Sequence, residues 1–300
     1  MKINPILQKD IKTKLRGWRS VILICSYVTL LIFILLIYFV GNDLIYSYTM
    51  PSFNPRVAIG GYNLLITFQF ALLYLAVPAI IATSISSERE RQTLDLMLVT
   101  KTPAREIIAG KILVSIAHIL LLLIASMPVV GVVFFFGGIG FPDLLKLIFF
   151  YILTSLFVAS SGVFFSTIFK RNIVSIITTY IFLGLMTFGP FLGFFAYSLL
   201  NQMTFSPTYR SIALSLFPSP VFGFLSFYFS GTSHYDIFGS YYGHGLFSSI
   251  AYEFEVLIAS ETGLLRYMQP WIVNGIFSVL FSLLLILLSS AALNPVRRKK

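Results

Sequence analysis

The sequence predicts an all-α integral membrane protein, built as a single bundle of transmembrane helices. Of its 300 residues, 57% are apolar and only 11% are charged, whereas a soluble protein carries roughly 25% charged residues. The apolar residues gather in uncharged stretches that are long enough to cross a bilayer, and no polar stretch between them is long enough to form a soluble core. Helices are the default spanning structure because they satisfy their own backbone hydrogen bonds inside the hydrocarbon.

Six stretches are long enough to span. A helix needs about 20 apolar residues to cross about 30 Å of hydrocarbon, and this length is reached at residues 20–40, 62–84, 112–135, 147–169, 173–199 and 271–292. The basic N-terminus is similar to the start of a signal peptide, but the first apolar run is too long and lacks a small-residue cleavage site. We therefore expect an uncleaved first span, and we treat residues 1–300 as one transmembrane domain.

The basic residues predict which ends of the spans face the cytoplasm. Six Lys and Arg residues precede the first span, five lie within 88–111, two separate the fourth and fifth spans, and four follow the last span. These 17 of the 21 basic residues fall on one side, and the positive-inside rule makes that side cytoplasmic. We expect a multi-pass protein of the cell (plasma) membrane with both termini in the cytoplasm. The net charge of +10 then reflects topology and contact with membrane lipid, and it does not indicate a nucleic-acid partner.

The segment 200–270 is expected to lie on the outer side of the membrane. Within it, residues 211–233 are uncharged and apolar enough to span, but Pro218 and Pro220 interrupt them, and a seventh span would disturb the predicted orientation. We interpret this stretch as a re-entrant or interfacial helical element, which is tolerated where surrounding protein covers its irregular backbone. A true seventh span is the alternative.

The first 19 residues, 1–19, have the pattern of a basic amphipathic helix. Apolar residues recur at steps of three and four, which places them in one stripe, while Lys9, Lys12 and Arg16 fall largely outside it. A helix of this kind ahead of a span lies on the cytoplasmic leaflet. It either anchors the topology alone or also contacts a cytoplasmic partner.

A charged island, residues 88–111, separates the second and third spans. Charges at this density cannot lie in hydrocarbon, so the island must form a structured loop at the membrane surface. Residues 88–99 are good helix formers without Gly or Pro. Pro103 suits the first turn of a second helix with Thr102 as its N-cap, and that helix would run through Lys111 into the third span. Loops between spans need only a few residues, so this island indicates contact with another protein.

The island follows a recognisable order: E-R-E directly after an apolar span, then T-L, then a Pro, then G-K before the next span. The residues in this order are Glu88, Arg89, Glu90, Thr93, Leu94, Pro103, Glu106, Gly110 and Lys111. The pattern closely resembles the cytoplasmic segment of permease subunits of type-2 ABC exporters. Gln92 departs from it, because many members have Gly there. The basic N-terminal helix, the six-span order and the outer element before the last span also fit, so the resemblance covers nearly the whole chain.

This resemblance implies a non-catalytic permease subunit that pairs with a separate ATP-binding cassette ATPase subunit. The ATPase would bind ATP and Mg, and no cofactor is expected on this chain. The permease would work as a dimer with a second copy or a sister permease. The first part of the island would be a coupling helix seated in a groove of the ATPase, and its contact residues would be Glu88, Arg89, Glu90, Arg91, Thr93, Leu94, Asp95, Met97 and Leu98. Lys9, Lys12 and Arg16 would make a second contact with a partner.

A few residues within the spans are candidates for a translocation path. Gln69 in the second span and His118 in the third are isolated polar groups, and an ionisable group inside a membrane indicates function by default. Gly189 and Gly193 form a G-x-x-x-G on the fifth span, a spacing that lets helices approach closely. Packing within the chain is the alternative interpretation for both pairs.

Residues that other functions need are missing from the sequence. There is no G-x-x-x-x-G-K-[ST] phosphate loop, so this chain alone is not expected to hydrolyse ATP. We assign no catalytic residue, and we assign no metal site because the spacing of His234, Asp236 and His244 matches no ligand pattern. An ion- or proton-coupled carrier or channel is the alternative function, although such proteins usually carry charges in mid-membrane. The aromatic, uncharged spans favour export of an apolar or amphipathic substrate.

Overall fold

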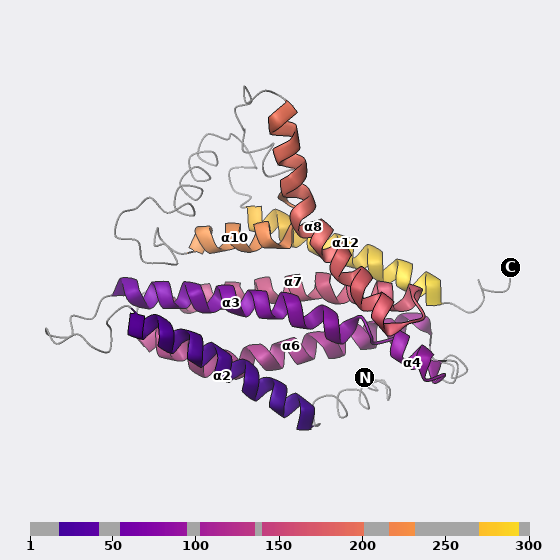
Figure 1. Cartoon of the computed structure of the whole chain (residues 1–300), viewed down its shortest axis with the longest axis horizontal. Helices are drawn as coiled ribbons and strands as arrows, with labels where there is room; N and C mark the ends of the chain where they lie inside the picture. The colour runs from indigo at the N-terminus through magenta and orange to yellow at the C-terminus, as the bar shows by residue number, and fades with distance from the viewer. Residues whose placement is uncertain are drawn as a thin grey trace, which may run out of the picture.

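The computed structural model describes residues 18–41, 55–94, 103–135, 140–200, 216–231 and 270–293. Within these ranges the chain forms eight helices and no strand (Figure 1). Two helices are short, α4 (Ser86–Glu90) and α10 (Pro220–Gly231). The other six are long and apolar enough to cross a membrane. They are α2 (Trp18–Gly41), α3 (Pro55–Ile81), α6 (Ala104–Phe135), α7 (Phe141–Ile168), α8 (Asn172–Leu200) and α12 (Pro270–Leu293). The predicted all-α fold with six membrane-spanning helices is confirmed.

Two of these helices begin earlier than the sequence predicts, by about two turns each: α3 and α7. The helix α6 begins at Ala104 and runs into the third span, as the position of Pro103 predicts. At 1.5 Å per residue, the 32 residues of α6 measure about 48 Å, which exceeds the about 30 Å of hydrocarbon. The extra length of α6 carries the second part of the charged island, and the Pro103 carbonyl accepts the Glu106 N–H at 2.9 Å in its first turn. One helix therefore joins the island to the third span, whereas Thr102 lies outside the described residues.

The helix α7 lies at the centre of the bundle and packs against α3, α6, α8 and α12. Phe150, Tyr151 and Phe157 are at most 1% exposed. A face of small residues lets the end of α3 come close, because a Cβ added to Gly162 would lie only 3.0 Å from Ile81 Cγ2. This close approach explains why α7 carries small side chains where its neighbours carry Leu and Phe.

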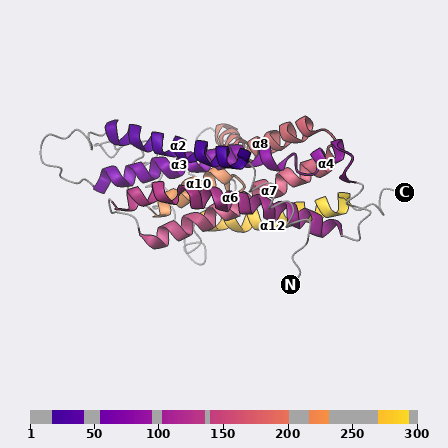
Figure 2. The same ribbon diagram turned by 90° about the horizontal axis from the view of Figure 1, so that it is seen from below.

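The short helix α4 lies at one end of the bundle, where α12 also ends (Figures 1 and 2). We call this the α4 end. The chain reaches it through α3, leaves it through α6, and returns to it at the junction between α7 and α8. The functional site described below is built from α4 and from the ends of α3, α6, α7 and α8 that meet here.

The helix α10 is a short element that packs against the bundle without crossing it. Its 12 residues measure about 18 Å, too little to span the hydrocarbon. A buried turn precedes it, in which Ser219 Oγ donates to the Thr187 carbonyl at 3.1 Å. Asn274 Nδ2 donates to the carbonyls of Phe217 at 2.6 Å and Ser219 at 3.1 Å. The side chain of Asn274 thus satisfies two carbonyls of the irregular backbone, and Ser219 bonds the turn to α8. Irregular backbone is tolerated within a membrane protein where other protein groups satisfy it in this way.

The second half of α8 leaves the bundle (Figure 1). Phe188 and Leu192 are each 66% exposed, and no atom lies within 4 Å of a Cβ added to Gly184, Gly189 or Gly193. Within the part of the chain that the structure describes, this half of α8 is an uncovered apolar surface.

Candidate functional site

The helix α3 ends in an elbow, residues 82–85, that turns the chain into α4. Hydroxyl groups from two other helices hold this elbow in place. Ser166 Oγ of α7 accepts the backbone N–H groups of Ile85 and Ser86, each at 2.9 Å. Ser175 Oγ of α8 donates to the Ala82 carbonyl at 2.6 Å. Backbone groups that the elbow leaves without helical partners are therefore bonded to α7 and α8.

Glu88 pairs with Lys111 across the gap between α4 and α6. Lys111 Nζ donates to Glu88 Oε1, and the two side chains are 6% and 15% exposed, respectively. A charge that is buried to this extent is stable only when it is paired. The pair therefore fixes α4 against the base of the third span.

Arg89 reaches the last turn of α7. Its Nη2 donates to the Thr167 carbonyl at 3.0 Å. Carbonyls in the last turn of a helix have no partner within the helix, and a cation is favoured there by the helix macrodipole. Arg89 therefore satisfies and stabilises the end of the fourth span.

Glu90 reaches the first residue of α8. Its Oε1 accepts the backbone N–H of Asn172 at 2.8 Å, and its Oε2 accepts the Asn172 side-chain amide. A carboxylate is favoured at a helix N-terminus, where backbone N–H groups have no helical acceptor. Three consecutive residues thus contact three different spans.

Gln92 ends α4 in a left-handed conformation. Its φ is 57°, and no other non-glycine residue in the described ranges has a positive φ. The Gln92 N–H donates to the Arg89 carbonyl at 3.1 Å and the Thr93 N–H donates to the Glu88 carbonyl at 2.9 Å. These two bonds define a Schellman motif, whose left-handed position is usually occupied by glycine. The one departure from the resembled sequence pattern therefore falls at the position where glycine fits best.

The left-handed turn sends Leu94 back into the bundle. Leu94 is 4% exposed and belongs to the core that includes Ile107 and Ile108 of α6. Leu94 is thus packed within this chain, and its expected contact with a partner stays a prediction. Arg91, Gln92 and Thr93 are exposed. Asp95, Met97 and Leu98 lie outside the described residues, as do Lys9, Lys12 and Arg16, so their expected contacts stay predictions.

The structure adds two residues that the sequence-based contact set leaves out. Arg105 and Glu106 are exposed in the first turn of α6, on the helix that Glu88 joins to α4. Pro103, which starts this helix, is the signal in the sequence that places both residues beyond the span. The exposed polar surface of the α4 end therefore combines Arg91 to Thr93 with the base of α6.

The polar residues expected along a path occupy different environments. Gln69 is buried and donates to Ser126 Oγ of α6 at 2.9 Å, so it joins two helices. His118 is half-buried on α6. Gly189 and Gly193 are not packed against any described residue. Packing within the chain therefore accounts for Gln69, whereas none of the described residues packs against the two glycines.

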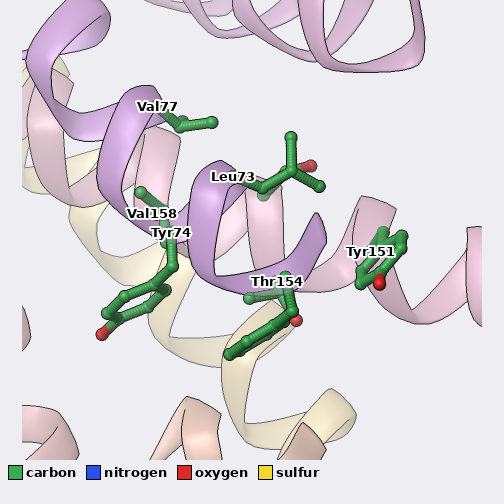
Figure 3. A pocket seen from close by; sticks show the side chains of 8 residues that line it. Leu73, Tyr74, Val77, Tyr151, Thr154 and Val158 are labelled. Atoms are coloured by element: carbon green, nitrogen blue, oxygen red, sulfur yellow. The ribbon is translucent and has the colours of Figure 1, made fainter. Parts of the chain in front are cut away.

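A small cavity lies between α3 and α7 (Figure 3). It is lined by Phe70, Leu73, Tyr74, Val77, Tyr151, Thr154, Ser155 and Val158. The Tyr151 hydroxyl donates to the Ile66 carbonyl at 2.8 Å, and the Tyr74 hydroxyl bonds to Thr187 Oγ1 at 2.8 Å. The lining carries no titratable group other than these two tyrosines, and both of their hydroxyl groups are bonded within the chain. Among the described residues, no three His, Cys, Asp or Glu side chains gather as a metal site would require.

Comparison with known proteins covers most of the chain. The model of a family described as "ABC-2 family transporter protein" matches residues 42–287. This range includes the elbow, α4 and all of α3, α6, α7, α8 and α10. No curated protein matches the chain.

Proposed function

The chain belongs to the ABC-2 family of transporter proteins, and on that premise we propose that it is the membrane-spanning permease subunit of an ATP-driven exporter. ATP and Mg would be bound by a separate ATP-binding cassette subunit, because this sequence contains no phosphate loop. The α4 end would face the cytoplasm of the cell membrane, which agrees with the distribution of basic residues.

The observation that carries this proposal is the construction of the α4 end. The elbow and α4 are bonded to α6, α7 and α8, while Arg91 to Thr93 remain exposed beside them. An element of this kind can receive a push from a cytoplasmic subunit and pass it to the spans. A loop without these bonds would deform under the push and transmit little of it.

The uncovered half of α8 supports a dimeric assembly. Gly189 and Gly193 stand one helical turn apart, and no described residue lies within 4 Å of a Cβ added to either. Glycines at this spacing let two membrane helices approach closely. We infer that a second permease, either another copy or a sister chain, covers this surface. The cargo would then pass between the two permeases, and the apolar, aromatic character of the spans favours an apolar or amphipathic substrate.

Co-purification and turnover test the main proposal. The tagged chain is extracted from its own cells in mild detergent, and an ATP-binding cassette subunit is expected to elute with it. In proteoliposomes, the complex is expected to hydrolyse ATP and to move a fluorescent lipid analogue across the bilayer, and removal of ATP should stop this movement. An eluate without an ATPase subunit, or ATP turnover that is the same with and without this chain, would contradict the proposal.

Cysteine labelling tests the orientation. The chain has one cysteine, Cys25, so Cys25→Ser gives a cysteine-free background, and Thr93→Cys places one thiol at an exposed position of the α4 end. A membrane-impermeant maleimide is expected to label this thiol in opened cells and to spare it in intact cells. Labelling in intact cells would place the α4 end outside and overturn the assignment.

A further inference from the structure

We propose that Glu88, Arg89 and Glu90 are positioning residues that fasten α4 to three spans, and that they do not form the contact with the ATPase subunit. This inference rests on the proposed function, because it assigns the parts by which movement of that subunit reaches the membrane. It differs from the expectation drawn from the sequence, in which all three side chains face the partner.

Glu88 is not available to a partner while it neutralises Lys111. The two side chains are 15% and 6% exposed, so a partner that drew Glu88 outward would separate the buried Lys111 ammonium from this carboxylate. Removal of one member of a buried pair is strongly destabilising. The Glu88–Lys111 pair therefore keeps α4 bound to α6 while the partner is in contact.

Arg89 and Glu90 are occupied at the junction between α7 and α8. Arg89 bonds to the Thr167 carbonyl in the last turn of α7, and Glu90 bonds to both amide groups of Asn172 at the start of α8. Both contacts have the charge that the local helix end favours. Both side chains thus have partners within this chain.

These contacts constrain the direction as well as the distance of α4. Charge-assisted hydrogen bonds are short and directional, whereas packed apolar helices slide past one another at small cost. Ser166 holds the preceding elbow through two further N–H groups. A displacement of α4 therefore moves the adjoining ends of α6, α7 and α8 together.

The contact with the ATPase subunit is then made by residues that follow Glu88, Arg89 and Glu90 in the chain. Arg91, Gln92 and Thr93 are exposed at the end of α4, and Arg105 and Glu106 are exposed at the base of α6. Arg91 directly follows Glu90 and is exposed as Glu90 is, which makes it the matched comparison for Glu90. We thus assign these five exposed residues to the contact with the ATPase subunit, and Glu88, Arg89 and Glu90 to the contacts that hold α4 against the spans.

Two measurements distinguish binding from coupling. The first is the Kd between the ATPase subunit and the full chain in nanodiscs, and the second is the amount of transport per ATP hydrolysed in proteoliposomes. Glu90→Ala and Glu88→Lys are expected to keep Kd within about twofold while transport per ATP falls at least about fivefold, the lower range of typical coupling between sites. Adding Lys111→Glu to Glu88→Lys restores an opposite-charge pair and should recover transport. Arg91→Glu should instead raise Kd and leave transport per bound complex unchanged.

The inference is overturned if Glu90→Ala raises Kd as Arg91→Glu does while transport per ATP stays normal. It is also overturned if the variant with both Glu88→Lys and Lys111→Glu folds but transports no more per ATP than Glu88→Lys alone. Glu90 is exposed, so Glu90→Ala is expected to fold even where Glu88→Lys does not, and it decides the question alone in that case. Failure of the proposed function looks different: the wild-type chain then binds no ATPase subunit, and the inference falls with it.

Discussion

Replacing Lys111 by methionine isolates the buried ion pair at the α4 end. Methionine is an unbranched apolar side chain that adapts to irregular spaces, so the main losses are the charge and its hydrogen bond. Glu88 would then hold its charge with only 15% of its side chain exposed. Breaking a buried pair costs about 3–5 kcal/mol. Because Glu88 retains some exposure, we expect a loss of about 3 kcal/mol in the free energy of unfolding, at the lower end of that range.

The loss is measured by titrating the purified chain with SDS in mixed micelles and following the helical circular dichroism. The exposed pair Asp143–Lys146 supplies the control, because its side chains are 35% and 54% exposed and its nitrogen–oxygen distance is 3.3 Å. Exposed pairs contribute about 0–1 kcal/mol, so Lys146→Met should change the stability little. Adding Glu88→Gln to Lys111→Met removes the stranded charge and should recover a large part of the loss.

Two results would refute the reasoning. A loss for Lys111→Met no larger than that for Lys146→Met would show that the pair does not hold α4 in place. A double variant with Glu88→Gln that is less stable than Lys111→Met alone would show that the loss does not come from the stranded carboxylate.

Four further substitutions test other parts of the structure. Gln92→Gly should raise the free energy of unfolding by up to about 1 kcal/mol, because glycine adopts a φ of 57° without strain; a decrease would contradict the left-handed turn. Gly162→Leu should lower the free energy of unfolding by about 1–3 kcal/mol through overpacking against α3. Gly131→Ala is the control and should not lower it, because no described atom lies within 4 Å of the added Cβ. Equal losses for the two variants would argue against the close approach of α3 and α7. Asn274→Leu removes the donor to two carbonyls of the turn before α10 and should cost about 1–3 kcal/mol, with faster hydrogen exchange in α10; unchanged exchange would speak against it. Gly189→Leu should leave monomer stability within about 0.5 kcal/mol but reduce the dimer fraction in sedimentation, and an intact dimer would remove α8 from the interface.

The membrane fold could be predicted from the sequence because its signals are local. Apolar composition over about 20 residues predicts a span, and Pro103 predicts the start of a helix within a single turn. Pro218 and Pro220 likewise indicate an interruption within 211–233, and the part of this stretch that the structure describes contains the short helix α10. The early starts of α3 and α7 were missed because a helix can extend past the hydrocarbon, and hydropathy does not report on that extension.

The candidate site could be located from the sequence, but the direction of its side chains could not. The partners of Glu88, Arg89 and Glu90 stand 23, 78 and 82 residues further along the chain, beyond the reach of any local pattern. A helix of five residues is also too short for periodicity to define a face. The burial of Leu94 could not be predicted for a similar reason, since the reversal at Gln92 that precedes it is a backbone property of one residue.

The hydrogen bonds of Thr187 connect α3 with the turn before α10. Its side chain bonds to Tyr74 of α3, and its carbonyl accepts from Ser219 in that turn. The same helix α3 continues through the elbow into α4. Any sliding of α3 must therefore either break the Tyr74 contact or carry α8 and the turn before α10 along with it. A displacement that begins at α4 would in this way also reach an element that packs on the other side of α8.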